Sequence, residues 1–150
     1  MNSNLEISCI ILTPDGKVAD GNYAAVKVPA LDGYMGILAN HAPIAAVVTT
    51  GIITLTKPDN SQKEFFVSKG FLEVSENHVK ILAEECMPTN KLDAEKSWDI
   101  LQETYKMPRD TKAQEKSREE AIHAARTRFS IAQKARKSTK NIDDILKSGL

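Results

Sequence analysis

The sequence lacks long apolar runs and closely spaced cysteines. No apolar run approaches the ~18 residues of a membrane-spanning helix. Residues 1–6 contain no basic region followed by an apolar core, so we expect no signal peptide and a cytosolic chain. The two cysteines, Cys9 and Cys86, are far apart in apolar, strand-like surroundings, which favours buried, reduced thiols over a metal site.

Recognisable catalytic motifs are also missing. The chain has neither a phosphate-binding loop ending in Lys-Ser or Lys-Thr nor a Gly-x-Ser-x-Gly nucleophile elbow. His78 falls in a polar turn and His123 on a mostly solvated helix, so we expect neither to bind a metal. His41 has no adjacent nucleophile, so we expect it to orient its loop through a hydrogen bond. We therefore predict a binding or structural protein with no catalytic residue, metal or cofactor.

What the first 88 residues do contain is a β pattern. Short alternating or apolar runs are separated by turn signals, and they cover residues 5–12, 26–28, 45–48, 52–56, 65–67, 71–74 and 79–83. This spacing leaves no room for crossover helices, so we expect antiparallel pairing. We predict an α+β protein whose residues 1–88 form an antiparallel β-sandwich of about ten short strands.

The apolar period becomes helical in residues 89–150. We expect Asn90 to cap a first helix and Thr111 to form a capping box with Gln114 at the start of a second, which runs from residue 113 to about 137. Two sets of side chains fall at helical spacing: Ala94, Trp98, Leu101 and Tyr105, then Ala121, Ala125, Phe129, Ala132 and Ala135. We predict an antiparallel two-helix hairpin followed by a short tail. Because its large apolar side chains are few, the hairpin should be marginally stable and open easily.

Charge is divided unevenly between these two parts. Residues 1–88 carry 6 lysines and 10 acidic residues, a net of −4, whereas residues 89–150 carry 14 basic and 10 acidic residues, a net of +4. All 5 arginines lie in the second part, and residues 126–140 contain no acid. This basic stretch fits a solvated helix face or a surface that docks on an acidic protein. Nucleic acid is not expected, because aromatic residues are not interleaved with the cations.

Two segments resemble the signatures of ATP synthase epsilon subunits. Residues 32–44, Asp-Gly-Tyr-Met-Gly-Ile-Leu-Ala-Asn-His-Ala-Pro-Ile, are similar to the family's Gly-x-hydrophobic-Gly-Ile segment that runs into Gly-His-Ala-Pro-Leu. Residues 67–74, followed by 79–84, look like its second signature. The order of sandwich and Ala-rich hairpin also matches, to about residue 137. The resemblance implies the epsilon subunit of a bacterial rotary F-type ATP synthase.

The resemblance implies a non-catalytic subunit of the central stalk, which couples ion-driven rotation of the c ring to ATP synthesis. The sandwich would dock on the gamma subunit and the c ring, at the cytoplasmic face of the inner membrane, and would associate with the membrane only through the complex. The segment matching the c-ring contact includes Asp32, Gly33, Tyr34, Met35, His41 and Pro43. Of these, Tyr34 and Met35 would be exposed contact residues rather than core.

The resemblance also implies a regulatory role for the hairpin. In the bacterial family it extends along gamma and restrains ATP hydrolysis. Cations of the second helix would then meet acidic segments of the catalytic beta subunits, and of alpha: Arg126, Arg128, Lys134, Arg136 and Lys137.

Two positions depart from the family's pattern. Asn40 stands where the family has Gly, although Asn tolerates the left-handed backbone that such a turn requires. The ATP-binding motif of some bacterial members, Leu/Ile-Asp-x-x-Arg-Ala, reads Leu-Asp-Ala-Glu-Lys-Ser at residues 92–97. Lys96 lacks the two-pronged donor geometry of arginine. Asp93, Lys96 and Arg128 are therefore at most the remnant of a nucleotide site, and we assign none.

Two other hypotheses compete with the resemblance. A free ligand-binding sandwich with a helical appendage predicts a concave pocket and no large partner. An enzyme that uses His41 predicts that the substitution His41→Ala abolishes turnover.

Overall fold

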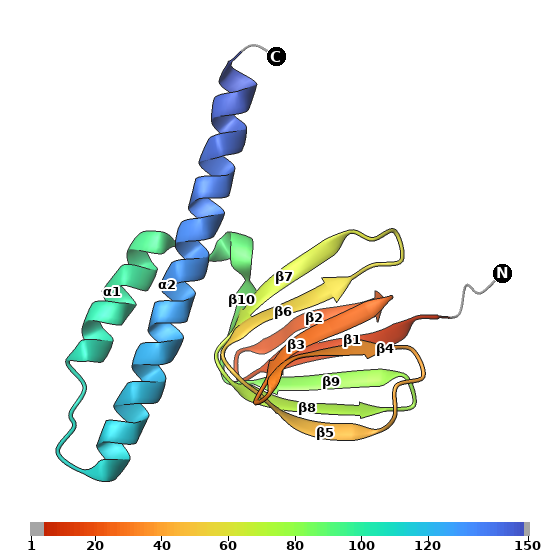
Figure 1. Ribbon diagram of the computed structural model, residues 1–150, viewed down its shortest axis with the longest axis horizontal. Helices are drawn as coiled ribbons and strands as arrows, with labels where there is room; N and C mark the ends of the chain where they lie inside the picture. Colours follow the sequence, from red (N-terminus) through yellow and green to blue (C-terminus); the bar gives the residue numbers. More distant parts are fainter. Residues whose placement is uncertain (1–4, 149–150) are drawn as a thin grey trace. The chain divides into compact units, whose positions relative to one another are not determined.

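The structure, a computed structural model, describes residues 5–148 and divides into two units, Met1–Pro88 and Thr89–Leu150. Strands make up the first unit and helices the second (Figure 1). The strands are β1 (Ile7–Thr13), β2 (Gly16–Tyr23), β3 (Ala25–Ala30), β4 (Gly33–Leu38), β5 (Ile44–Val48), β6 (Gly51–Thr56), β7 (Gln62–Val67), β8 (Gly70–Ser75), β9 (His78–Ala83) and β10 (Cys86–Pro88). The helices are the short 3₁₀ helix η1 (Thr89–Lys91), α1 (Ala94–Tyr105) and α2 (Lys112–Lys147). The predicted fold class is confirmed.

Nine of the ten strands form one continuous hydrogen-bonded path. Its order is β10-β7-β6-β3-β5-β8-β9-β1-β2, and β4 pairs with β3 beside this path. The path folds back on itself, so that β6 and β7 face β8 and β9 across the core (Figure 1). β1 and β9 pair in parallel, contrary to the expectation of antiparallel pairing alone. No crossover helix is needed, because seven intervening strands connect these two neighbours.

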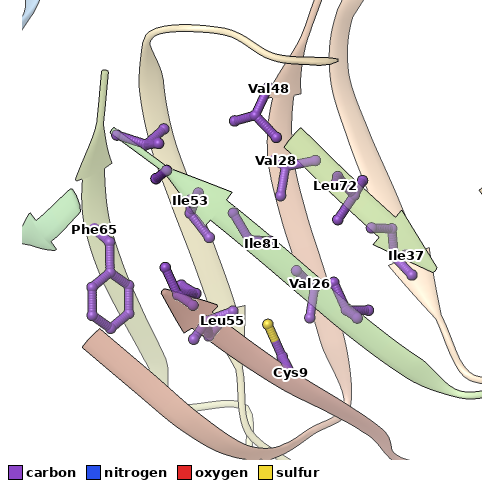
Figure 2. Close-up of a cluster of buried hydrophobic side chains, with 14 of the residues drawn as sticks. Cys9, Val26, Val28, Ile37, Val48, Ile53, Leu55, Phe65, Leu72 and Ile81 are labelled. Atoms are coloured by element: carbon purple, nitrogen blue, oxygen red, sulfur yellow. The ribbon is translucent and has the colours of Figure 1, made fainter. Parts of the chain in front are cut away.

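Alternation of side chains decides what is buried in the sandwich. In β9 the pattern is strict, with Val79, Ile81 and Ala83 inside and the residues between them outside. The inward rows of the strands meet in one apolar cluster, which Figure 2 shows between the strands. Cys9 and Cys86 belong to this cluster as free, buried cysteines, as the sequence predicts.

The helical unit is a hairpin in which α1 and α2 run antiparallel. The capping box of Thr111 and Gln114 is present, as predicted. The predicted cap of α1 is wrong: η1 covers Asn90, and the side chain of Asp93 accepts the capping hydrogen bond from the backbone N–H of Lys96. α2 continues to Lys147, about ten residues beyond its predicted end, because the proposed tail has the composition of a helix and meets no breaker.

The face that α1 presents to α2 includes the predicted residues and is wider than predicted. The buried side chains of α1 are Ser97, Leu101 and Thr104. The predicted Trp98 and Tyr105 stay partly exposed but contact α2: the rings of Trp98 and Phe129 lie 5.2 Å apart, and the hydroxyl of Tyr105 accepts a hydrogen bond of 3.1 Å from Arg126. Apolar spacing found only one side of this face, because the two buried positions on the other side, Ser97 and Thr104, carry small hydroxyl side chains instead of apolar ones.

Candidate docking surfaces

The segment with the epsilon-subunit signature is a strand with a turn at each end. Gly33 begins β4 with a positive φ of 114°, directly after the tight turn that contains Asp32. His41 and Pro43 follow the other end of β4. A six-residue strand is about 17–20 Å long, so Asp32 and His41 lie at opposite ends of the sandwich edge. The predicted contact segment therefore offers two separate surfaces.

Strand alternation separates Tyr34 from Met35. The side chain of Tyr34 is 56% exposed, and the Nζ atom of Lys27 lies 4.8 Å from the centroid of its ring. Met35 is partly buried and packs against the core cluster. The expectation that both are exposed is wrong for Met35, because successive side chains of a strand point to opposite faces.

His41 lies in a tightly bonded turn. Its backbone N–H donates to the carbonyl of Leu38 at 3.1 Å, and its Nδ1 lies 2.7 Å from the carbonyl oxygen of Ala42. That carbonyl can only accept, so Nδ1 carries the proton in this arrangement. The imidazole thus bonds to its own loop.

A row of apolar side chains, three of them exposed and one, Leu12, half-buried, crosses the outer face of four neighbouring strands. The strand register places Val47 of β5 opposite Phe71 of β8, Phe71 opposite Leu82 of β9, and Leu82 beside Leu12 of β1. We call these four residues the outer apolar row. Phe71 is 66% exposed and is the most exposed phenylalanine of the described residues. Exposed apolar side chains in a contiguous group mark an interaction surface more often than scattered ones do.

Two hollows flank the outer apolar row. One, of about 480 Å³, is lined by Pro43, Ile44 and the outward side chains of β8 and β9. The other, of about 530 Å³, is lined by Leu12, Pro14 and Val47. Phe71 and Leu82 contribute to both, so they stand between two shallow depressions into which a partner's side chains could fit.

The backbones of β8 and β9 approach each other very closely beside the row. A Cβ atom added to Gly70 would lie 2.1 Å from the carbonyl oxygen of Leu82. No side chain can occupy that space, so glycine is required here. The close approach fixes the register that sets Phe71 opposite Leu82.

The outer apolar row was not predicted, although the sequence carries a signal for it. Phe71 and Leu82 occupy positions where alternation within their strands calls for an outward, polar side chain. Only the register, which no single strand reveals, shows that these two exceptions to the pattern are neighbours.

The predicted docking cations of the hairpin divide into two groups. Arg126, Lys134, Arg136 and Lys137 are exposed on α2. Arg128 is only 8% exposed, and burial lowers the pKa of its guanidinium. In this hairpin Arg128 is therefore part of the packed seam and not of the exposed basic surface, contrary to the prediction.

The three residues of the suspected nucleotide remnant do not converge. The carboxylate of Asp93 accepts a hydrogen bond of 2.9 Å from the backbone N–H of Lys96, and this bond lowers the pKa of Asp93. A hollow of about 710 Å³ beside Asp93 is lined by Arg136 and Lys140, but by neither Lys96 nor Arg128. Asp93 acts as a helix cap in this arrangement.

The described residues, 5–148, contain no group of three or more His, Cys, Asp or Glu side chains placed to hold a metal ion. Neither α1 nor α2 has both the length and the apolar composition of a membrane-spanning helix.

Comparison with known proteins identifies the family of the first unit. Residues 6–89 match the family model described as the β-sandwich domain of the ATP synthase Delta/Epsilon chain. The chain is 37% identical to the ATP synthase epsilon chain of Symbiobacterium thermophilum over 109 residues, which cover 72% of this chain and 78% of that one. It is 40% identical to the epsilon chain of Alkalihalophilus pseudofirmus over 87 residues, or 58% of this chain and 65% of that one, just under two thirds of its length.

Solved structures extend the likeness in fold to most of the chain. A chain of the Euglena gracilis mitochondrial ATP synthase, determined as an OSCP/F1/c-ring assembly, superposes with a TM-score of 0.68 at 22% identity. The superposition covers 85% of this chain and 82% of that chain. The family model matches more than half of the sequence, and the Symbiobacterium alignment, with 109 residues, includes parts of both units. The protein therefore belongs to the epsilon-chain family of ATP synthases, whose members are subunits of that complex and not its catalytic chains.

Proposed function

We propose that this chain is a rotor subunit of an F-type ATP synthase, in which it helps couple ion-driven rotation of the c ring to ATP synthesis. The observation that carries the proposal is the outer apolar row, in which Phe71 stands exposed between two hollows. A side chain of this size gains roughly 1.5–3 kcal/mol when a partner buries it. The row is therefore a ready docking surface for a large, stable partner.

The gamma subunit is the proposed occupant of the outer apolar row. A rotor subunit has to be held firmly while torque passes through it, and a contact built on apolar burial suits that need better than exposed ion pairs do. The ion pair of Lys69 and Glu84, at 3.7 Å, borders the row and adds a polar rim. Pro43 of the signature segment lines one of the hollows and belongs to this surface.

The turn between β3 and β4 is the proposed contact with the c ring. It presents Leu31, Asp32 and Tyr34 as exposed side chains at one end of the sandwich. His41, which was predicted to share this contact, lies at the other end of β4 and does not belong to the proposed surface. This contact would place the chain at the cytoplasmic face of the membrane, to which it would be attached only through the complex.

The helical hairpin is the proposed brake on ATP hydrolysis. The exposed cations Arg126, Lys134, Arg136 and Lys137 give α2 a basic surface for acidic segments of the catalytic beta and alpha subunits. α2 measures about 54 Å at 1.5 Å per residue, against about 18 Å for α1, so much of it extends beyond the hairpin seam.

The brake is tested with a chain that ends at Thr89. This end preserves β10, whose three residues pair with β7 and complete the sandwich. Complexes assembled with the short chain should retain their subunits and hydrolyse ATP severalfold faster than complexes with the full chain. A full-length triple substitution, Lys134→Gln, Arg136→Gln and Lys137→Gln, should produce part of the same increase. Equal hydrolysis in all three complexes would remove the brake and leave the family assignment intact.

A further inference from the structure

The side chain of Tyr34 is exposed, yet its position on the sandwich is fixed. The register of β3 and β4 pairs Tyr34 with Pro29, so both side chains lie on the outer face of the sheet. A Cβ atom added to Gly51, the first residue of β6, would lie 3.2 Å from the hydroxyl of Tyr34 and 3.0 Å from Cβ of Pro29. The phenol of Tyr34 therefore reaches from β4 past Pro29 to the start of β6.

Gly51 leaves open the notch that receives this hydroxyl. Its backbone does not require glycine, because among the glycines only Gly16 and Gly33 have a positive φ. What Gly51 contributes is the missing side chain. A methyl group there would press on both the hydroxyl of Tyr34 and the ring of Pro29, at distances below the 3.5–4.0 Å of a relaxed contact.

Lys27 holds the phenol from a second direction. It is an exposed residue of β3 on the same face as Pro29, two positions earlier. Its Nζ atom lies over the phenol of Tyr34, 4.8 Å from the ring centroid. A cation within about 6 Å of the centroid is attracted to the negative face of an aromatic ring. The notch fixes one end of the phenol and the ammonium group attracts its face, so the two together favour one orientation.

We propose that Lys27 and Gly51 are positioning residues, which hold Tyr34 in the orientation in which it meets the c ring. The inference rests on the proposed contact between the β3–β4 turn and the c ring. A side chain that is already ordered loses less conformational entropy on binding, which for one residue raises affinity about two- to tenfold. Lys27 and Gly51 thus contribute to the contact through Tyr34 and not by touching the partner.

Substitutions at Lys27 test this role in the full-length chain bound to gamma, which is titrated with detergent-solubilised c rings. Tyr34→Ala should lower the affinity at least tenfold, and Lys27→Gln about two- to tenfold. Lys27→Arg restores a cation over the phenol and should recover the affinity of the parent. In the Tyr34→Ala chain, Lys27→Gln should have no further effect, because Lys27 acts through the phenol. Lys63→Gln, the same charge change at an exposed position of β7, is the matched control and should leave the affinity unchanged.

NMR spectra of the free full-length chain report the position of the phenol directly. Its ring current should shift the Cε protons of Lys27 upfield in the parent. The shift should vanish in Tyr34→Ala and shrink in Gly51→Ala, whose methyl group displaces the hydroxyl. Gly51→Ala also crowds Pro29 and should lower the melting temperature, so its spectrum is recorded well below that temperature.

Four results would overturn the positioning role while Tyr34→Ala still weakens binding to the c ring. They are parent-like affinity of Lys27→Gln, loss of affinity in Lys27→Arg, additive losses in the double variant, and Lys27 protons whose shift does not respond to Gly51→Ala. Parent-like affinity of Tyr34→Ala would have a different meaning. It would contradict the proposed c-ring contact itself, and with it any role for residues that position Tyr34.

Discussion

The side-chain oxygen of Asn77 accepts a hydrogen bond of 2.5 Å from the backbone N–H of Asn40, 37 residues earlier in the chain. Both residues adopt left-handed backbone, with φ of 66° at Asn40 and 62° at Asn77. The bond ties the loop after β4 to the turn between β8 and β9. The backbone carbonyl of Asn77 also accepts from the N–H of Ser8 at 2.9 Å, so one turn residue holds three segments together.

Two substitutions at Asn77 separate its hydrogen bond from its backbone geometry. Asn77→Gly keeps the left-handed conformation and loses the side-chain acceptor, which should cost about 1 kcal/mol of unfolding free energy. Asn77→Ala loses the acceptor and also strains the backbone, which should add about 1 kcal/mol. Urea denaturation measures both. Asn60→Gly, at a left-handed turn closed by a backbone bond to Lys57, is the control and should be nearly neutral. Equal stability of the parent and Asn77→Gly would contradict the role of the bond.

A methyl group at Gly70 should force β8 and β9 apart. Because its Cβ would lie 2.1 Å from the carbonyl oxygen of Leu82, Gly70→Ala should destabilise the sandwich by about 3 kcal/mol. Gly36→Ala provides the matched control, since nothing lies within 4 Å of its added Cβ. Thermal unfolding followed by circular dichroism compares the two. If both variants melted together, the close approach at Gly70 would be disproved.

Phe71 should matter for assembly and little for folding. Phe71→Ser changes an exposed side chain, so the unfolding free energy should stay within about 0.5 kcal/mol of the parent. Affinity for the isolated gamma subunit, measured by titration calorimetry, should fall at least tenfold. Leu31→Ser makes a comparable change at the proposed c-ring turn and should leave affinity for gamma unchanged. If the affinity for gamma depended on Leu31 and not on Phe71, the gamma subunit would instead bind at the turn between β3 and β4.

The buried thiols should make stability fall at high pH. Burial, with smaller contributions from Cys86 and Asp20, raises the pKa of Cys9 from 9.0 to about 12, and burial raises that of Cys86 to about 12. The unfolded chain loses these protons near pH 9 and the folded chain near pH 12. The thiols' contribution is therefore intact below pH 9 and declines between pH 9 and 12. Between about pH 8 and pH 10.5, the parent should lose more unfolding free energy than the double variant Cys9→Ala, Cys86→Ala. Parallel pH profiles of the two proteins would show that the thiols do not contribute.

The sequence predicted the strands that carry an alternating pattern or a continuous apolar run, such as residues 65–67 of β7, and missed those that carry neither. Seven strands were located by residue, among them β6 and β9, which have strict alternation. β2, β4 and β10 were not located. β2 and β4 are largely exposed edge strands with two glycines each, and β10 has three residues, so none carries a periodic apolar signal. The left-handed Asn40 was predicted correctly, because the side-chain chemistry of a turn residue is a local property.

The candidate surfaces were harder to predict because they depend on register and burial. The four side chains of the outer apolar row come from strands up to 70 residues apart in sequence, since Leu82 lies beside Leu12. Burial of Arg128 depends on which face of α2 meets α1, and hydroxyl residues in the seam of α1 concealed that face. The family could be identified from the resemblance in sequence. The division of the signature segment into two surfaces is visible only in the structure, which places β4 between them. Membership in the epsilon-chain family, whose members are not the catalytic chains, also contradicts the competing hypothesis of an enzyme that uses His41.

The central claim, a rotor subunit held through the outer apolar row, is tested most directly by affinity purification of the tagged full-length chain from its own cells. The account predicts that gamma and c subunits co-purify with the parent chain in fixed stoichiometry, and that the Phe71→Ser chain, equally abundant and folded, recovers far less gamma. Recovery of the parent chain without any ATP synthase subunit would contradict the account.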